Sequence, residues 1–264
     1  MKISHLMTNN SFCVCPLASG SKGNSLFVSC CNSSVLIDAG LSGIETERRL
    51  SAINIDPESL TAIVITHEHS DHVKGAGILS RRFQLPVYIN KKTYQAAPQL
   101  GKIEDLRFFE CGTPFEINQI LITPFSISHD AKDPAGLTME YNGHKIGIAT
   151  DLGIATSLVK EHLKNSHILY LESNHDLEML INGPYPWHLK QRIKGRTGHL
   201  SNIDAKVLVS ELKTDQLKHV ILAHLSEENN CPKKAALEVS KSLNASDIAL
   251  HVAGPDQPGK LIKL

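Results

Sequence analysis

A short stretch of this chain, THEHSDH, places three histidines and two acidic residues within six positions, directly after an apolar run that ends at Ile65. Alternate side chains share one face of an extended backbone, so His67 and His69 can bind one metal ion together. If the chain then turns, Asp71 and His72 face a second ion on the opposite side. Imidazole and carboxylate ligands without a thiolate suit Zn²⁺, Mn²⁺ or Fe²⁺ and argue against a closed structural zinc site.

A solvated loop that happens to be rich in histidine is the alternative interpretation, because the chain contains 14 histidines and some clustering is expected. The stretch follows residues 62–66, which we predict to be a buried strand. Functional side chains are often carried by loops that a rigid scaffold positions. We therefore favour a metal site over a solvated loop.

Four further residues with suitable side chains follow or end predicted strands elsewhere in the chain: Asp38, His129, Asp151 and His224. Each also has an ordinary structural explanation. The two histidines could simply end strands, and Asp151 could cap the helix that follows it. Asp38 precedes Ala-Gly and could be a turn residue. The residues alone leave these alternatives open.

The elements expected around these residues alternate between strands and helices. The hairpin at 138–151 has the clearest signal, since Asn142-Gly143 is the preferred pair for a type I′ turn between two apolar runs. We also predict strands at 86–90, 119–128, 168–173 and 220–224, two strands around an Asn-Ser-Ser turn within 25–40, and helices at 45–55, 73–83 and 233–243. Mixed connections of this kind predict an α/β or α+β domain with at least two sheet regions.

The composition is that of an ordinary globular protein: 264 residues, 41% apolar and 20% charged, with a formal net charge of +0 and a pI ≈ 7.2. No global field therefore draws the protein to nucleic acid or to anionic lipid. The first residues lack the apolar core of a signal peptide, and no later run is long enough to span a bilayer. The six cysteines form no CxxC pair. We expect a cytoplasmic protein with reduced thiols and no membrane partner.

Local charge gives the first indication of a substrate. No acidic residue lies within residues 179–203, whereas Lys190, Arg192, Lys194 and Arg196 accumulate there. Lysine and arginine neutralise backbone phosphates, so this stretch suits nucleic acid as a partner. A solvated basic surface loop is the alternative.

Two other segments offer contacts to a substrate. Tyr185 and Trp187 lie just upstream of these basic residues and could stack on a base. In SGSKGNS, the glycines could let backbone N–H groups approach an anion, with Ser21, Lys22 and Asn24 as polar contacts. The segment lacks the Walker pattern, and a plain turn that leads into a strand explains it equally well.

The order of these motifs resembles that of the metallo-β-lactamase superfamily. HEHSDH matches the H-x-H-x-D-H signature, while Asp38 in LIDAG, His129 in SISHD, Asp151 in ATDLG and His224 in LAHLSEENN match its first, third, fourth and fifth motifs. More narrowly, the chain resembles the YycJ/WalJ-type metallo-hydrolases over residues from about 13 to about 253. The shared phrases are CPLASGSKGNS, ESNHD, NGPYP, GHLSN and HLSEENN.

The resemblance implies two divalent ions in a four-layer αββα sandwich of two mixed sheets flanked by helices. Carried over by position, His67, His69 and His129 would hold one ion, Asp71, His72 and His224 the other, Asp151 would bridge them, and Asp38 would support the loop without ligating. Residues 13–264 would form this single domain, and residues 1–12 an N-terminal extension.

The implied chemistry is hydrolysis. Two divalent ions about 3.5–4 Å apart can share a water, lower its pKa to give a bridging hydroxide, and stabilise charge during attack on phosphorus. Asp71 would orient that hydroxide as well as ligate. The resemblance points to nucleic-acid hydrolysis, in particular to a DNA exonuclease, so we expect a phosphodiesterase.

Residues outside the ligand set would then serve the substrate. His199 or His175 could contact the scissile phosphate or protonate the leaving oxygen. Asn174, Ser201 and Asn202 could hold His199 or a phosphate. A purely structural role is the alternative for each of these residues.

Three other functions compete with a nuclease. A small-molecule hydrolase, such as a lactonase or thioesterase, would use the same ions and would be favoured by a narrow, closed and neutral cleft rather than an open groove flanked by Arg192 and Arg196. A flavin-linked di-iron protein is disfavoured, because that branch replaces His69 by glutamate. A non-catalytic polyanion-binding protein is disfavoured because all the ligand positions are filled.

Overall fold

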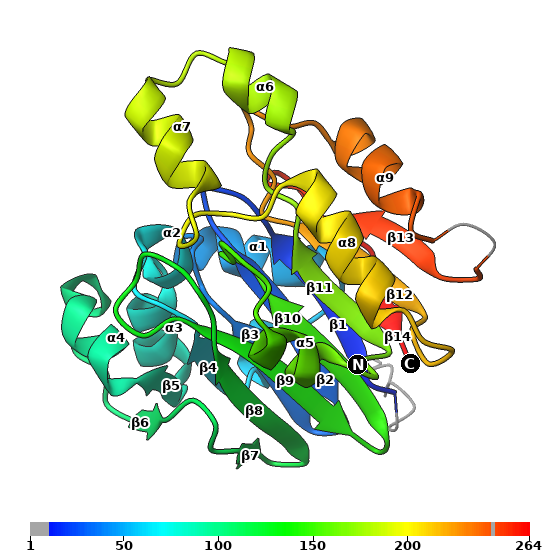
Figure 1. Ribbon diagram of the computed structural model, residues 1–264. Coiled ribbons are helices and arrows are strands. Elements are labelled where there is room, and N and C mark those ends of the chain that lie inside the picture. Colours follow the sequence, from blue (N-terminus) through cyan, green and yellow to red (C-terminus); the bar gives the residue numbers. More distant parts are fainter. Residues whose placement is uncertain (1–10, 244–245) are drawn as a thin grey trace.

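The protein, described by a computed structural model over residues 11–243 and 246–264, contains two seven-stranded sheets packed face to face. Helices cover the outer face of each sheet (Figure 1). This four-layer αββα sandwich confirms the predicted fold class. Of the predicted extension, residues 1–12, only the last two are described, and Phe12 is fully buried. The domain boundary at residue 13 stays a prediction.

The first sheet has the strand order β14-β1-β2-β3-β4-β5-β6. Its strands are β1 Cys13–Ala18, β2 Ser25–Cys30, β3 Ser33–Ile37, β4 Ala62–Ile65, β5 Val87–Asn90, β6 Leu106–Phe109 and β14 Ile262–Lys263. The pairs from β14 to β3 are antiparallel and those from β3 to β6 are parallel.

The second sheet has the order β13-β12-β11-β10-β9-β8-β7. Its strands are β7 Phe115–Ile117, β8 Ile120–Ser126, β9 Ala135–Tyr141, β10 His144–Ala149, β11 Ile168–Glu172, β12 His219–Ala223 and β13 Ala249–Val252. Here β10 to β13 are parallel and the others antiparallel.

Helices connect these strands, and two short 3₁₀ segments join them. The α-helices are α1 Gly43–Ala52, α2 Ser70–Val73, α3 Ala76–Phe83, α4 Lys91–Ala96, α5 Ser157–Leu163, α6 Leu177–Asn182, α7 Trp187–Lys194, α8 Asn202–Leu212 and α9 Pro232–Ser240; the 3₁₀ segments are η1 Pro57–Ser59 and η2 Pro98–Leu100. No described helix is both long and apolar enough to cross a bilayer.

Alternating side chains explain the layered core. In β2, Leu26 and Val28 face the second sheet, whereas Phe27 faces the helices outside. The outer layers are built in the same way, with Leu50 of α1 packed on the first sheet and Leu208 of α8 on the second. A sandwich buries one face of each sheet against the other and the second face against helices.

Two local predictions need correction. The turn between β2 and β3 is Cys31-Asn32, because Cys30 pairs with Ser33; the expected Asn-Ser-Ser turn was placed too late. The single helix predicted at 73–83 is two helices, since the chain breaks between α2 and α3 at Gly75. The Asn142-Gly143 hairpin is confirmed, with φ of 46° and 78° at its two turn residues.

Candidate metal centre

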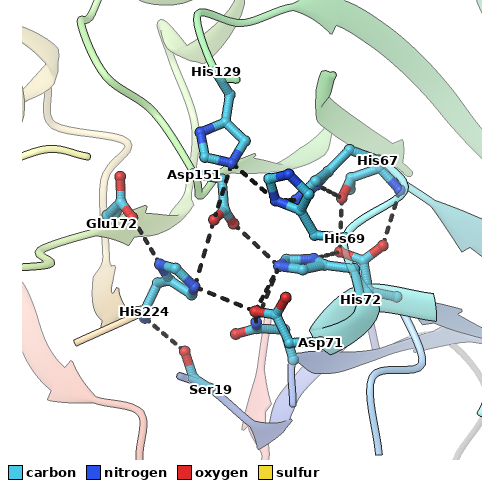
Figure 2. A network of polar contacts seen from close by, with 12 residues as sticks. Ser19, His67, His69, Asp71, His72, His129, Asp151, Glu172 and His224 are labelled. Atoms are coloured by element: carbon cyan, nitrogen blue, oxygen red, sulfur yellow. Dashed lines mark hydrogen bonds and ion pairs between the residues drawn. The ribbon is translucent and has the colours of Figure 1, made fainter. Parts of the chain in front are cut away.

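The seven predicted ligands converge on one buried location between the ends of the two sheets (Figure 2). Six of them follow strand ends: four follow β4 in the first sheet, and one each follows β10 and β12 in the second, where the parallel pairings bring these ends to the same edge. His129 follows β8 at the same edge. Carboxyl ends of parallel strands are where open α/β sheets place their sites.

The first group of ligands is formed by His67, His69 and His129. His67 Nε2 lies 3.1 Å from His69 Nδ1, and His129 Nε2 lies 3.3 Å from the same nitrogen. Three imidazole nitrogens therefore face a single point. The predicted grouping for one ion matches this arrangement.

The second group is formed by Asp71, His72 and His224. Asp71 Oδ2 lies 3.5 Å from His72 Nε2 and 3.7 Å from His224 Nε2. The turn at α2 brings Asp71 and His72 to this second group, while the ring of His72 stays close to that of His67, with ring centroids 4.0 Å apart.

Asp151 lies between the two groups. Its Oδ2 is 3.3 Å from His72 Nε2, and its Oδ1 is 3.6 Å from His129 Nε2 and 3.4 Å from His224 Nε2. One carboxylate thus faces histidines of both groups, which is the position that a bridging ligand requires.

Asp38 fixes the loop that carries the cluster. Its Oδ1 accepts a hydrogen bond from Thr66 N, and its Oδ2 accepts from Thr66 Oγ1 at 2.8 Å and from His72 Nδ1 at 2.7 Å. Because Thr66 Oγ1 donates to Asp38, it can accept from His67 Nδ1 at 3.0 Å. The inner nitrogen of each imidazole, Nε2, is then left to face the cluster, and Asn24 Nδ2 lies 3.0 Å from that of His72. Such outer partners fix the tautomer of a ligand histidine.

Glu172 is a site residue that the sequence analysis did not identify. It ends β11, is fully buried, and its Oε1 lies 2.8 Å from both His224 Nδ1 and His199 Nδ1. Its Oε2 accepts from the backbone N–H groups of Leu152 and Leu200. An ionisable residue that ends an apolar strand beside β12 was the signal that could have revealed it.

Glu172 also forms a close group with Asp151, His199 and His224, with ligand atoms all within 4.8 Å of one another. Both of its oxygens are already used by four donors, and His224 turns Nδ1 rather than Nε2 towards it. We therefore interpret this group as a hydrogen-bonded support for His224 and not as a further metal site.

The backbone is strained at three of these residues. Asp38, Asp151 and His224 have φ values of 60°, 55° and 55°, in the left-handed region that non-glycine residues rarely adopt. Asp38 and His224 directly follow the last residue of a strand, and Asp151 lies two residues after the end of β10. Strained residues of this kind cluster at functional sites, where the surrounding structure holds them.

Close packing also restricts one glycine near the cluster. A Cβ on Gly40 would lie 1.6 Å from the carbonyl oxygen of Asp71. That oxygen accepts a hydrogen bond from Asn24 N at 2.7 Å. Only glycine allows the loop after β3 to approach α2 this closely.

Protonation states follow from burial and charge. Burial lowers the pKa of His67 and His129 below the usual value. Burial also opposes the charged form of His72, but the carboxylates of Asp151 and Asp38 outweigh it and raise its pKa to about 10. The pKa of His224 likewise rises well above its usual value, because Asp151 and Asp71 outweigh its burial.

The donor set fits divalent metal ions. Asp151 Oδ2 and His224 Nε2 are buried and make no hydrogen bond with the described residues, although buried polar atoms are normally paired. Five imidazoles and two carboxylates, with no thiolate, match the preferences of Zn²⁺, Mn²⁺ and Fe²⁺. Metal ions at the two groups would satisfy these unpaired atoms.

A cleft of about 190 Å³ adjoins the centre. Eleven residues line it: Ser21, Asp130, Asn174, Tyr185, Leu189, Arg192, Ile193, Gly198, His199, His224 and Ser226. Because His224 belongs to both, a molecule in the cleft lies beside the second ligand group.

His199 reaches this cleft and His175 does not. The pKa of His199 is raised, because Glu172 outweighs the effect of burial. His175 is 1% exposed, and burial lowers its pKa to about 4. The structure therefore does not bring His175 to a position where it can contact a substrate phosphate.

The residues predicted to hold His199 or a phosphate divide in the same way. Asn174 lines the cleft and donates to the carbonyl oxygen of His224 at 2.8 Å. Ser201 caps α8, and Asn202 is buried in hydrogen bonds with Ser173 and Asn230. Ser201 and Asn202 are thus structural residues away from the cleft.

The three residues of the glycine-rich segment that we predicted to contact a substrate differ in their position relative to the cleft. Ser21 is exposed and lines the cleft. Lys22 points to solvent and pairs with Glu227 at 2.7 Å. Asn24 is buried and donates to Asp71 Oδ2 at 3.0 Å, so it supports a ligand instead of contacting a substrate.

The basic stretch is less available than its sequence suggested. Lys190 is buried and donates to the carbonyl oxygens that end α6, Ile181 and Gly183. Arg192 lines the cleft, but its Nε donates to Asp130 at 2.7 Å. Arg196 is exposed and does not line the cleft.

Comparisons with known proteins agree with this geometry. The family model described as Beta-lactamase superfamily domain matches residues 33–225. Exodeoxyribonuclease YycJ of Bacillus anthracis is 39% identical over 254 residues, covering 93% of this chain and 96% of that protein. Exodeoxyribonuclease WalJ of Streptococcus pneumoniae serotype 2 (strain D39 / NCTC 7466) is 38% identical over 241 residues, covering 89% and 90%.

A solved structure shows the same fold. The metallo-β-lactamase fold protein YhfI from Bacillus subtilis aligns with a TM-score of 0.74 at 15% sequence identity, covering 97% of this chain and 100% of that one.

Proposed function

This chain belongs to the β-lactamase superfamily and, within it, to the family of YycJ and WalJ, and we propose that it is a two-metal phosphodiesterase that degrades DNA from an end. The observation that carries the proposal is the pair of ligand groups joined by Asp151, which faces histidines of both. Two ions, drawn from Zn²⁺, Mn²⁺ and Fe²⁺, fit these groups.

When bound, two such ions supply a strong nucleophile from water at neutral pH and stabilise the charge of the phosphoryl transition state. The residues of the chain position the ligands, the attacking water and the substrate around these ions. Asn24 holds Asp71 through its Oδ2 at 3.0 Å, so that Asp71 can orient the attacking water.

His199 is suited to protonate the leaving oxygen. Glu172 fixes its Nδ1 and raises its pKa against the effect of burial, so the imidazolium form is favoured. The other ring nitrogen is then available to a group in the cleft that His199 lines. On bond cleavage the leaving oxygen takes that proton, and His199 becomes neutral.

DNA as the substrate is supported by the relatives. Both YycJ and WalJ are named exodeoxyribonucleases, and each aligns with most of this chain. The exposed Arg196 and Lys194 near the cleft offer contacts to a phosphate backbone.

A small-molecule hydrolase is the second candidate, and the cleft favours it. Its volume of about 190 Å³ is small, and most of its lining is uncharged. The sequence analysis named such a cleft as the mark of a lactonase or thioesterase.

The direct test measures metal content by elemental analysis together with degradation of duplex and single-stranded DNA. We expect two metal ions per chain and loss of activity by at least 100-fold in Asp71→Ala. His188→Ala, which changes an exposed histidine outside the cleft, is the matched control. A metal-loaded protein that leaves all DNA intact but opens lactones or thioesters would establish the second candidate instead.

A further inference from the structure

One wall of the cleft is formed by apolar side chains of α7 and of the segment that leads into it. Leu189 and Ile193 line the cleft and are four residues apart, which places them along one side of α7, and Tyr185, two residues before α7 begins, lines the same cleft. All three are half-buried, whereas Trp187 between them is 65% exposed and does not line the cleft. Figure 1 shows α7 beyond the strand ends, at the end of the molecule that carries the site.

The charged side chains that line the cleft are already paired with each other. Apart from the histidines, the charged residues of its lining are Asp130 and Arg192, and Arg192 Nε donates to Asp130 Oδ2 at 2.7 Å. Asp130 Oδ1 in turn lies 3.5 Å from His129 Nε2, so the pair joins α7 to the first ligand group. The described lining therefore offers no unpaired lysine or arginine for a second phosphate.

The remaining polar groups are uncharged. Ser21, Ser226 and Asn174 also line the cleft, and Asn174 Nδ2 donates to the carbonyl oxygen of His224 at 2.8 Å. Hydroxyl and amide groups suit the edges of a base or the oxygens of a sugar, and an apolar or aromatic wall suits the face of a base. This lining matches a nucleoside better than a phosphate.

Size limits the occupant further. The cleft is smaller than the roughly 300–1,000 Å³ of sites for drug-sized ligands, at about 190 Å³. A single base fits such a space, and a base pair does not.

We infer that the cleft binds the terminal nucleoside of the DNA strand, with its base against Tyr185, Leu189 and Ile193, while the phosphate that follows it lies at the metal centre. This inference rests on the proposed function and specifies its substrate end. The terminal base must leave its pair to enter, which costs the unstacking of one step. Water then attacks the phosphorus, the P–O bond to the remaining strand breaks, and the freed oxygen of that strand takes a proton, so the terminal nucleoside leaves with the phosphate as one mononucleotide.

The first experiment compares a DNA strand with an ordinary end and the same strand with an abasic terminal nucleotide. We expect wild type to prefer the ordinary end about tenfold in kcat/KM, from the stacking of one base. Tyr185→Ala and Leu189→Ser should lose the preference, whereas the matched aromatic control Trp187→Ala should retain it. Equal rates on both ends with wild type, or a preference that survives in both cleft variants, would overturn the inference and leave the nuclease proposal intact.

A binding experiment tests the inference without catalysis. Isothermal titration of the metal-loaded protein with deoxyadenosine monophosphate and with 2-deoxyribose 5-phosphate separates the base from the phosphate. Wild type and Trp187→Ala should bind the nucleotide about tenfold more tightly than the sugar phosphate, and Tyr185→Ala should bind both alike. Equal affinities in wild type would refute the nucleoside site, whatever the protein hydrolyses. A nucleotide preference in a protein inactive on DNA would keep the site and reject the nuclease.

Discussion

At the metal centre, His67, His72, His129 and His224 each have an outer ring nitrogen held by an acceptor within 3.3 Å. On the opposite side of the cleft, α7 reaches the centre through the Arg192–Asp130 ion pair and otherwise presents apolar side chains. A catalytic centre must hold its reacting atoms to within about 0.5 Å. A wall that stacks on a base needs only an apolar surface of suitable shape. Removing a hydrogen-bond acceptor of a histidine at the centre should therefore lower activity far more than removing a charge near α7.

Among the residues outside the predicted ligand set, the largest effect is expected at Glu172. Glu172→Gln keeps the size of the side chain but replaces one acceptor oxygen by a donor, so it loses either the two histidines at Oε1 or the two backbone N–H groups at Oε2. Loss of such an outer partner typically costs 10–100-fold in metal affinity or activity, and here two donors lose their acceptor together. We expect about 100-fold lower activity, measured on DNA beside the exposed control Glu178→Gln. Activity within threefold of wild type would show that Glu172 does not support the site.

The second largest effect is expected in the pH dependence of metal affinity, because a metal ion displaces protons from its ligands. Without metal, His72 with a pKa of about 10 and His224 with a raised pKa hold protons at neutral pH. A metal ion binds the neutral imidazole, so its affinity should rise with pH from 6 to 9, by roughly tenfold per unit for each proton displaced. Titration calorimetry in buffers of different ionisation enthalpy measures the protons released. Affinity that is flat over this range would contradict the assigned charge states.

The smallest effect is expected for the two arginines of the basic stretch, which should differ in their contribution to DNA binding. Arg196 is exposed and makes no ion pair with the described residues, whereas Arg192 is paired with Asp130. Arg196→Ala should lower the salt dependence of DNA binding by about one in slope, and Arg192→Ala should lower it less. Fluorescence anisotropy at several salt concentrations provides the slopes. The reverse order would mean that Arg192 leaves Asp130 for a phosphate.

The two regions also differ in how far the sequence could predict them. The predicted ligands could be brought together because His67, His69 and Asp71 lie within five positions of one another, and because the resemblance to the superfamily assigned the distant residues, such as His224, in motif order. Glu172 was missed because its partners come from distant segments: the parallel pairing of β11 with β12 brings His224 to it, and the hydrogen bonds of Leu200 with Glu172 and Asn174 bring His199.

The basic stretch shows the opposite error. Lysines and arginines concentrated in sequence suggested an exposed phosphate-binding surface, but the turn between α6 and α7 buries Lys190 against two carbonyl oxygens. Asp130, 62 positions away from Arg192, neutralises the arginine that lines the cleft. Composition gives the number of charged residues but not their partners. Ion pairs between loops that are distant in sequence could therefore not be predicted.

The central claim is that two cations occupy the two ligand groups on either side of Asp151. Anomalous diffraction from crystals of the Mn²⁺- or Zn²⁺-loaded protein tests it most directly. We predict two peaks, one contacted by His67, His69 and His129 and the other by Asp71, His72 and His224, with Asp151 touching both. A single peak, or a peak held by Glu172 and His199, would contradict the account.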